Sequence, residues 1–570
     1  MHTTDGGMDG ADYIIEVLNR EKIDTVFTVP GAQIETLFNR LSQTSHIRPV
    51  ICAHEAGAAF MADGYARMKN VPGVVLVNGG PGLSNLITGI SVARSEYVPL
   101  LVISGDVPTY LAGQQAFQDA GQWGSKDLFI TENITKYASF TGHIEQLPVE
   151  IEKAFAALEE KPEGPSHLII PNDLFAEYVP EECFLQKSPH GQQAVSDEDI
   201  KTIENLLLSR PNVALCTGES LNRLDARPSL IKVCEHYGIP LLTTYGSKGI
   251  IPENHPLNFG NIGYAGRESS NRLLLSETLD GVIYLGAQLN ERNTLNWNDA
   301  LFSPERTIIH IDFDAVNRIF DRNSHINRII GNPGAFVKKL AHRLRKPSEE
   351  IRQQRNLWVA ALRANRQEYS APAQNVERNG LEPALVMEKL NTLLPDNTTL
   401  FVDSGQHRVF PGFYYRVSNE RSFFTSSIIA STGWALCAAI GAKKADPGKP
   451  VFVVAGDCCM RMHGLDIQTA VREKLAVVFL VFNNRTMGSV LARQMKQQLS
   501  LDTLVNHYDN DWKMFAESFG ACGATVDTEK ELEEEIEKSL ASTGKPTVID
   551  INIAFPSYFP EEIHTKSAYA

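Results

Sequence analysis

The sequence lacks the features that mark several specialised classes of protein. It contains no low-complexity tract, no run of basic residues and no stretch of about 18 consecutive apolar residues that would span a membrane. Acidic residues outnumber basic ones, 68 to 53, and the net charge of −15 argues against nucleic acid as a main partner. The first residues also lack the basic start and apolar core of a signal peptide. We therefore expect a folded protein that binds neither nucleic acid nor membrane.

Closely spaced cysteine pairs of the zinc-site type are absent as well. The eight cysteines are scattered along the chain, and Cys52, Cys216 and Cys437 stand in apolar stretches, as reduced core cysteines do. This cysteine usage predicts a reducing, cytoplasmic location.

A chain of 570 residues is too long for one hydrophobic core. Short runs of Val, Ile and Leu alternate with helix-length amphipathic pieces, which is the pattern of βαβ units on a parallel sheet. We predict an α/β protein of three domains, over residues 9–180, 195–345 and 375–560. Each is expected to hold a central, mainly parallel sheet flanked by helices.

Two stretches have the composition of linkers. Residues 186–199 are polar and predict the first domain boundary. Residues 344–380 are highly charged, and only the segment "LWVAALRA" within them has the composition to pack against a core. We therefore predict that most of this second stretch is a linker.

The first and third segments echo one another. Residues 74–106 and 451–484 both contain a strand, a glycine-containing turn, a helix and a second strand. The likeness is loose, but it is what two related domains would show.

Polar side chains follow two strands of the third segment. Asp457 comes after "VFVVAG" and Asn484 after "VVFLVFN". Because open parallel sheets bind ligands beyond the carboxyl ends of their strands, we expect both side chains at one sheet edge. The Asp457 carboxylate, the Asn484 amide oxygen and a carbonyl near Thr486 suit a magnesium ion that bridges a diphosphate. The alternative is that Asp457 caps a helix and Asn484 belongs to a turn.

The helix expected after Gly456 supports the first reading. It would carry Ile467, Ala470, Val471 and Leu475 on one face, and its N-terminal amides would favour an anion near Asp457.

The 27-residue interval from Asp457 to Asn484 resembles the signature of thiamine diphosphate enzymes, in which Gly-Asp-Gly is followed by Asn-Asn. The match departs at Cys458, where the family usually has Gly. In "PVICAHEAGAAFMADGYAR", Glu55 stands where the family has the glutamate that bonds the aminopyrimidine ring. The resemblance implies that Glu55 shares a proton with a ring nitrogen. A lone glutamate there would instead be a helix N-terminal carboxylate favoured by the dipole.

Further stretches resemble the acetolactate synthase branch of that family. "GGPGLSN" resembles its Gly-Pro-Gly loop, Gln118 stands where it has an active-site Gln, and Gln406 with His407 matches a phosphate contact. "STGWALCAAIGAK" resembles the stretch whose backbone grips the pyrimidine. The resemblance covers nearly the whole chain, and it implies the thiamine diphosphate-binding fold for the first and third domains and a Rossmann-like central domain.

The resemblance also implies a set of site residues. Glu55 and Gln118 are the catalytic candidates, and Asp457, Asn484 and Thr486 are the magnesium ligands. The implied cofactor-binding residues are Pro30, Glu55, Asn85, Gly405, Gln406, His407, Ala430, Thr432, Gly456, Asp457, Cys458, Cys459, Asn484, Thr486, Met487 and Gly488.

Three positions depart from the acetolactate synthase pattern. Thr432 replaces a Met that serves as an apolar wedge under the cofactor, and Ser489 and Arg493 replace a Met and a Trp that line the acceptor pocket. Arg493 would suit a substrate with a carboxylate, phosphate or sulfonate, or it is a surface arginine on a helix. The segment 289–294 matches the flavin loop of some relatives poorly, so FAD is possible but has no clear mark here.

The resemblance implies a reaction. We expect thiamine diphosphate- and magnesium-dependent decarboxylation of a pyruvate-like 2-oxo acid, with transfer of the acyl carbanion to an acceptor carbonyl. A simple 2-oxo acid decarboxylase or another acyl transferase is the nearest alternative, and a non-catalytic nucleotide-binding α/β protein is the alternative from another class. The resemblance further implies a homodimer or homotetramer with active sites between subunits.

Overall fold

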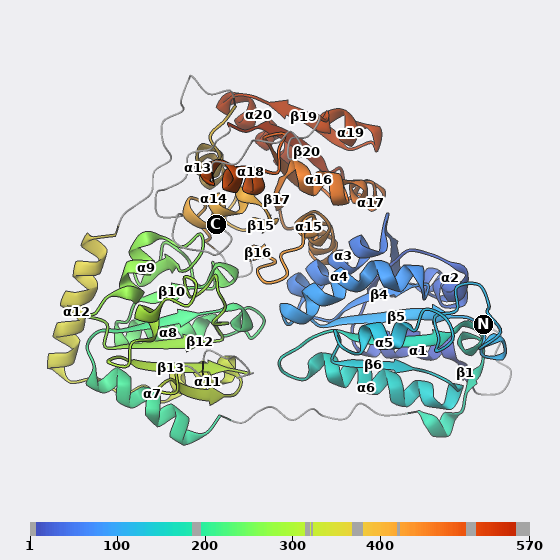
Figure 1. Ribbon diagram of the computed structural model, residues 1–570, viewed down its shortest axis with the longest axis horizontal. Coiled ribbons are helices and arrows are strands. Elements are labelled where there is room, and N and C mark those ends of the chain that lie inside the picture. The colour runs from blue at the N-terminus through green and yellow to red at the C-terminus, as the bar shows by residue number, and fades with distance from the viewer. Residues whose placement is uncertain are drawn as a thin grey trace.

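The computed structural model shows three lobes, each built on its own six-stranded sheet (Figure 1). The amino-terminal and central lobes lie side by side, and the carboxy-terminal lobe rests above both. Among the described residues, no helix combines the length and apolar character needed to cross a bilayer. The structure describes residues 7–184, 195–313, 320, 323–366, 380–418, 422–497 and 509–554.

The amino-terminal sheet has the strand order β3-β2-β4-β5-β7-β6, and all of its strands are parallel. Every residue of β4, β5 and β7 is buried, because helices cover both faces. The strands are β2 (Thr25–Thr28), β3 (Arg48–Ile51), β4 (Gly73–Val77), β5 (Leu100–Asp106), β6 (Tyr137–Phe140) and β7 (Ser166–Pro171), beside a small antiparallel pair of β1 (Met8–Asp9) and β8 (Tyr178–Val179). The helices are α1 (Gly10–Arg20), α2 (Glu35–Gln43), α3 (Glu55–Lys69), α4 (Pro81–Ser95), α5 (Asp127–Thr131) and α6 (Leu147–Glu159).

The central sheet has the order β11-β10-β9-β12-β13-β14, also parallel throughout. Numbered along this lobe the order is 3-2-1-4-5-6, the doubly wound Rossmann arrangement that the resemblance implies. The strands are β9 (Val213–Thr217), β10 (Leu241–Thr243), β11 (Asn258–Asn261), β12 (Gly281–Leu285), β13 (Thr307–Asp312) and β14 (Asn327–Ile330). The helices are α7 (Asp197–Ser209), α8 (Arg227–Tyr237), α9 (Glu268–Leu275), α11 (Pro333–His342) and α12 (Glu349–Ala364).

The carboxy-terminal sheet repeats the topology of the first. Its order, β16-β15-β17-β18-β20-β19, and that of the amino-terminal sheet both become 2-1-3-4-6-5 when strands are numbered within each lobe. The strands are β15 (Thr399–Val402), β16 (Phe423–Thr425), β17 (Val451–Gly456), β18 (Val477–Asn483), β19 (Cys522–Val526) and β20 (Thr547–Asn552). The helices are α13 (Pro383–Leu393), α14 (Val409–Phe413), α15 (Trp434–Ala445), α16 (Asp457–His463), α17 (Ile467–Arg472), α18 (Gly488–Lys496), α19 (Trp512–Ser518) and α20 (Glu529–Ala541).

The shared topology confirms the internal echo. The two echoing stretches form the third and fourth strands of their sheets with the helical segment between them. One detail of the prediction is wrong: the helix after Gly456 is broken into α16 and α17 by a 3-10 turn at Gly464–Asp466, and Leu475 lies beyond the end of α17.

Helices α3 and α15 join the amino- and carboxy-terminal lobes through one shared hydrophobic core. A Cβ added at Gly64 would lie 1.9 Å from the Ala438 carbonyl oxygen, and one at Gly441 would lie 1.8 Å from that of Met61. The two helix backbones therefore pack directly on each other, and glycine is required at both contacts.

Part of the second predicted linker is a helix that packs on the central lobe, and this helix includes the segment with the composition to pack. Residues 349–364 form α12, which begins at the N-cap Ser348. Arg355 is fully buried, and its guanidinium donates to the carbonyls of Leu207, Arg210, Pro211 and Tyr237. A charged side chain thus fixes this helix to the central lobe. Most of the first linker, and residues 367–379 of the second, lie outside the described residues.

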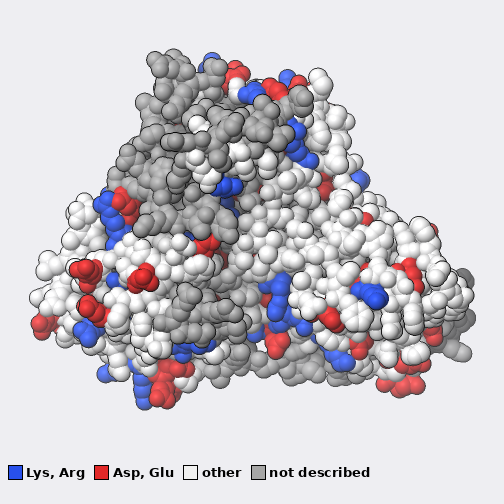
Figure 2. Space-filling model, viewed as in Figure 1, with Lys and Arg blue, Asp and Glu red and all other residues white. Residues whose placement is uncertain are grey.

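All eight cysteines are free, and Cys52, Cys216 and Cys437 are buried as the sequence predicts. Acidic and basic side chains are interspersed over the face of the molecule that Figure 2 shows.

Candidate active site

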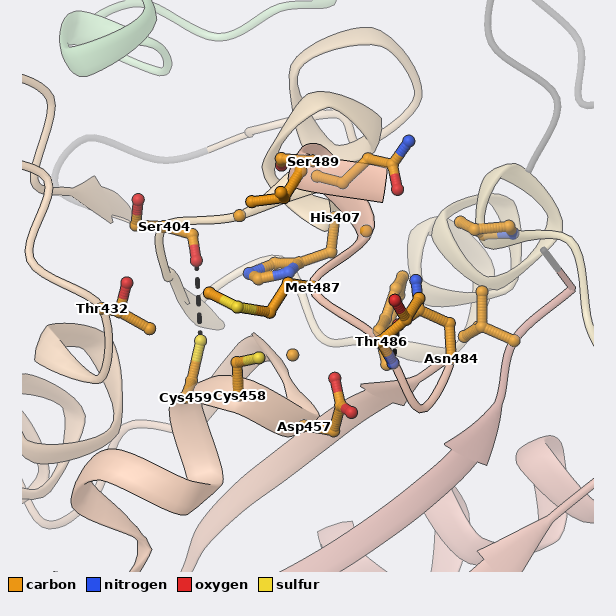
Figure 3. A pocket seen from close by; sticks show the side chains of 18 of the residues that line it. Ser404, His407, Thr432, Asp457, Cys458, Cys459, Asn484, Thr486, Met487 and Ser489 are labelled. Carbon is orange, nitrogen blue, oxygen red and sulfur yellow. Dashed lines mark hydrogen bonds between the residues drawn. The ribbon is translucent and has the colours of Figure 1, made fainter. Parts of the chain in front are cut away.

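A cavity of about 240 Å³ lies at the carboxyl ends of β15, β17 and β18, the edge at which parallel sheets bind ligands (Figure 3). Its walls come from the loops after these strands and from the start of α18. The lining residues are Pro383, Ser404, Gly405, Gln406, His407, Phe410, Thr432, Gly456, Asp457, Cys458, Cys459, Met462, Phe482, Asn484, Thr486, Met487, Gly488, Ser489, Val490 and Ile553.

The three proposed metal ligands come together in this cavity. Asp457 is the first residue of α16, and burial raises the pKa of its carboxyl group to about 6. Asn484 directly follows β18, and its side-chain oxygen accepts a hydrogen bond from the Thr486 amide over 3.2 Å. In Figure 3, Asp457, Asn484 and Thr486 lie around the same end of the cavity.

Glycines bring the backbone close to the same space. A Cβ added at Gly488 would lie 2.4 Å from Oε1 of Gln406. Gly405 has a φ of +149°, and a Cβ there would lie 2.5 Å from Cε1 of His407. Side chains at these positions would therefore collide with the residues that line the cavity.

His407 lies at the centre of the cavity in Figure 3. Burial lowers its pKa to about 3, so the imidazole is neutral at physiological pH. Its Nε2 is buried and has no hydrogen-bond partner within the described structure. A buried polar atom of this kind favours a polar group on a ligand.

The remaining predicted residues of this lobe divide into two sets. Cys458, Cys459, Met487, Thr432 and Ser489 line the cavity, and Cys459 Sγ contacts the Ser404 carbonyl over 3.6 Å, the dashed line of Figure 3. The lining residues do not include Ala430 or Arg493. Ala430 stands in the turn before Thr432 with a φ of +53°, and Arg493 lies further along α18.

Asp403 positions two segments beside the cavity, and the sequence prediction did not include it. Its buried carboxylate accepts hydrogen bonds from the amides of Ser404, Gly433 and Ala435, at 2.7 to 2.8 Å. It thereby fixes the loop after β15 against the turn that leads into α15. The available signal was the same one that identified Asp457, an Asp directly after a predicted strand.

The four predicted residues of the amino-terminal lobe lie apart from this cavity, since its lining residues all fall between 383 and 553. Asn85 donates to the Glu55 carboxylate over 2.9 Å. The glycine loop before and at the start of α4 approaches both Glu55 and Gln118: a Cβ at Gly82 would lie 3.8 Å from Glu55 and one at Gly80 3.9 Å from the Gln118 carbonyl. Pro30 is exposed beside Gly31. Glu55 is half-buried in this chain.

Three residues that the sequence prediction missed hold this second group in place. Gln33 accepts from the Gly79 amide over 2.8 Å and donates to the Gln118 carbonyl over 2.8 Å. Asp127 accepts from the Gly80 amide over 2.7 Å. Asp106, at the end of β5, accepts from the Ala120 amide over 2.8 Å. Asp106 carries the same signal as Asp457, an Asp at the end of a predicted strand, whereas no local sequence pattern distinguishes Gln33 and Asp127 from other polar residues.

The comparisons with known proteins agree with this arrangement. Family models for thiamine pyrophosphate enzymes match the N-terminal TPP binding domain at residues 8–123, the central domain at 200–340 and the C-terminal TPP binding domain at 403–551. Thiamine pyrophosphate and thiamine diphosphate are the same compound.

The chain is also similar along its length to several curated proteins. It is 28% identical to a probable acetolactate synthase large subunit of Methanococcus aeolicus, over 96% of this chain and 92% of that protein. It is 29% identical to the acetolactate synthase isozyme 1 large subunit of Escherichia coli (strain K12), over 85% and 83%. It is 27% identical to the mitochondrial acetolactate synthase catalytic subunit of Saccharomyces cerevisiae, over 97% and 82%. With all three family domains present in order, the chain belongs to the thiamine pyrophosphate enzymes.

Proposed function

We propose that this enzyme is a magnesium-dependent carboligase of the acetolactate synthase type. It decarboxylates a 2-oxo acid such as pyruvate and transfers the acyl unit to an acceptor carbonyl. The observation that carries the proposal is the convergence of Asp457, Asn484 and Thr486 on one glycine-walled cavity at the ends of β17 and β18. The similarity to acetolactate synthase large subunits supports the reaction class.

The cavity fits the diphosphate end of the cofactor. Asp457, the Asn484 side chain and the Thr486 backbone offer the oxygen donors that magnesium prefers. The neutral His407, with its unpartnered Nε2, and Gln406 would face the phosphate oxygens. Bound there, thiamine diphosphate supplies the stabilised carbanion chemistry of decarboxylation and acyl transfer.

The amino-terminal group would provide the proton chemistry. Glu55 would hold a proton between its carboxylate and a ring nitrogen of the cofactor, and Asn85 would orient that carboxylate through the existing hydrogen bond. Gln118, on a loop fixed by Gln33 and Asp106, would contact the substrate.

The proposal requires an assembly of at least two chains. The cavity of about 240 Å³ is smaller than the roughly 300–1,000 Å³ of typical ligand sites, and Glu55 is not part of it. Beside Gln118, Phe117 and Trp123 are 86% and 74% exposed, as expected of residues that another chain covers. We therefore propose a homodimer or homotetramer in which one chain adds its Glu55 face to the Asp457 cavity of another. The eight free cysteines support the cytoplasmic location that the sequence predicts.

Two residues of α18 are candidates for contact with the acceptor substrate. Ser489 lines it, and Arg493 is four positions further on the same face of α18. A substrate long enough to pass Ser489 would reach Arg493 with an anionic group, so we propose these two residues as the acceptor-side contacts.

Product analysis tests the proposal. The enzyme is incubated with magnesium, thiamine diphosphate and isotopically labelled pyruvate, alone and with aldehydes and 2-oxo acids, and products are identified by mass spectrometry. We expect CO2 release together with a product that contains a new carbon–carbon bond. CO2 with only free acetaldehyde would instead assign a simple decarboxylase. Absence of turnover by cofactor-loaded enzyme would exclude a pyruvate-like donor and direct the assay to anionic donors. The absorption spectrum of the purified enzyme tests for FAD.

A further inference from the structure

A second cluster of metal-binding side chains lies behind the cavity, at the junction of the amino- and carboxy-terminal lobes. Cys437 lies on α15, His463 is the last residue of α16, and Asp466 ends the 3-10 turn that follows. One sulfur, one ring nitrogen and one carboxylate oxygen of these residues all lie within 4.8 Å of one another.

Two of the three side chains are buried, His463 is half-buried, and the carboxylate has no cationic salt-bridge partner among the described residues. Cys437 is fully buried and Asp466 is 1% exposed. Asp466 accepts hydrogen bonds from the Ala53 amide over 2.9 Å and the Thr469 hydroxyl over 3.3 Å. None of the described lysines and arginines forms a salt bridge with it. A buried carboxylate without a counter-charge is costly, so a cation would stabilise this arrangement.

The geometry suits a tetrahedral ion. The Cys437 thiol donates a hydrogen bond to Asp466 Oδ2 over 3.6 Å, and a bound ion would take the place of this proton. Zinc bonds of about 2.3 Å to sulfur and about 2.0 Å to oxygen span that separation with an angle of about 110°, close to tetrahedral. The His463 ring is held in place by an edge-to-face contact with Phe60 at 5.2 Å. Because the three ligand atoms lie within 4.8 Å of one another, they must approach by up to about 1 Å to share one ion.

The backbone of α3 packs closely against the Asp466 carboxylate. A Cβ at Gly57 would lie 2.0 Å from Asp466 Oδ2, so a glycine on α3 is required to leave room for the carboxylate. Through Ala53 the same carboxylate binds the chain two residues before Glu55. The cluster therefore connects α15, α16 and the approach to α3.

We propose that Cys437, His463 and Asp466 form a zinc site, separate from the magnesium site at Asp457. Sulfur and imidazole donors select zinc over magnesium, which prefers oxygen ligands. Cys437 gives up its thiol proton to solvent on binding and coordinates as a thiolate. A water molecule would complete the coordination. Zinc here acts as a clamp between the two lobes.

Cobalt substitution tests the site directly. The full-length protein, freed of metal with a chelator and kept without thiamine diphosphate or substrate, is titrated with cobalt(II) while its absorption spectrum is recorded. We expect one equivalent to bind with a thiolate-to-cobalt charge-transfer band and tetrahedral d–d bands. Competition with a chromophoric chelator then gives the zinc affinity, in the presence of excess magnesium. We expect excess magnesium to leave that affinity unchanged.

Variants assign the ligands. Cys437→Ser and His463→Asn should each weaken zinc binding by at least about 100-fold, and Cys437→Ser should abolish the charge-transfer band. Cys522→Ser, which changes an exposed cysteine of the same lobe, should bind as the unmodified protein does. Cobalt bound without a charge-transfer band, or undiminished zinc affinity in Cys437→Ser, would overturn the proposal.

Thermal unfolding distinguishes a variant that has lost zinc binding from one that has failed to fold. Zinc should raise the melting temperature of the unmodified protein and of Cys522→Ser, and leave that of Cys437→Ser unchanged. An equal rise in Cys437→Ser would place the zinc elsewhere. Because every readout is taken without thiamine diphosphate, failure of the zinc site leaves the proposed reaction untouched, and the reverse also holds.

Discussion

At the scale of single residues, two buried carboxyl groups follow neighbouring strands of one sheet and differ in what they face. Burial raises the pKa of both Asp403 and Asp457 to about 6. Asp403 is satisfied by three backbone amides, whereas Asp457 faces the cavity. The protein thus carries the free-energy cost of an ionised Asp457 until a cation binds.

This cost predicts a pH-dependent effect of Asp457→Asn in the metal-free enzyme. The pKa of Asp457 in the folded state, about 6, lies above its ordinary value of 3.8. The stability that this group contributes is therefore complete below pH 3.8 and is lost as the pH rises through 6. Asp457→Asn should stabilise the metal-free protein by about 1–3 kcal/mol at alkaline pH and by much less at mildly acidic pH. Thermal unfolding at the two pH values measures the difference; an equal effect at both would contradict it.

Glu55→Gln should retain cofactor affinity and lose at least about 100-fold in turnover, because the amide cannot shuttle the proton. Glu35→Gln, which changes the first residue of α2, is the matched control for the helix-dipole interpretation of Glu55. It should leave turnover unchanged. Isothermal calorimetry gives the affinity and steady-state kinetics the turnover. Full activity of Glu55→Gln would remove Glu55 from the proposed chemistry.

At the scale of elements, α3 and α15 cross in direct contact, because glycines let their backbones touch. Gly441→Ala illustrates its tightness. Alanine ordinarily stabilises a helix interior relative to glycine, by up to about 1 kcal/mol. Here the new methyl group would meet the Met61 carbonyl at 1.8 Å.

We therefore expect Gly441→Ala to lower the free energy of unfolding by at least about 2 kcal/mol, reversing the sign of helix propensity. Gly448→Ala is the control, because its methyl group would have no neighbour closer than 3.7 Å, and it should change stability by less than about 0.5 kcal/mol. Denaturant melts of both variants measure the effect. A neutral Gly441→Ala would mean that α3 and α15 are less closely packed.

Much at this scale could be predicted from sequence. Buried parallel strands are continuous apolar runs, so "VFVVAG" and "VVFLVF" identify β17 and β18, and the polar residues after them identify one edge of the cavity. The sequence could not show that Arg355 would be buried, because its partners are backbone carbonyls about 120 to 150 positions away. It also could not show the break between α16 and α17, because apolar spacing continues across it. The cluster of Cys437, His463 and Asp466 depends on tertiary packing and leaves no local spacing signal.

At the scale of the whole molecule, the two halves of the proposed site lie on different lobes, and Glu55 does not line its own chain's cavity. Co-expression of Glu55→Gln and Asp457→Asn chains tests whether sites are shared. Each variant alone should be inactive. In a dimer with shared sites, half of the assemblies are hybrids, and each hybrid keeps one intact site, so we expect about a quarter of full activity. No activity in the mixture would place Glu55 and Asp457 of the same chain in one site.

The crossing of α3 and α15 would then have a mechanical role. Glu55 is the first residue of α3, and α15 begins directly after the Thr432 turn of the cavity. Because their backbones touch, the two helices form one stiff strut. In a dimer with shared sites, one end of each strut belongs to one site and the other end to the second. Closure of the Thr432 turn on a ligand would therefore displace Glu55 in the neighbouring site. Because α3 and α15 touch where Gly64 and Gly441 meet carbonyl groups, binding in one site would change turnover in the other, and turnover would be cooperative.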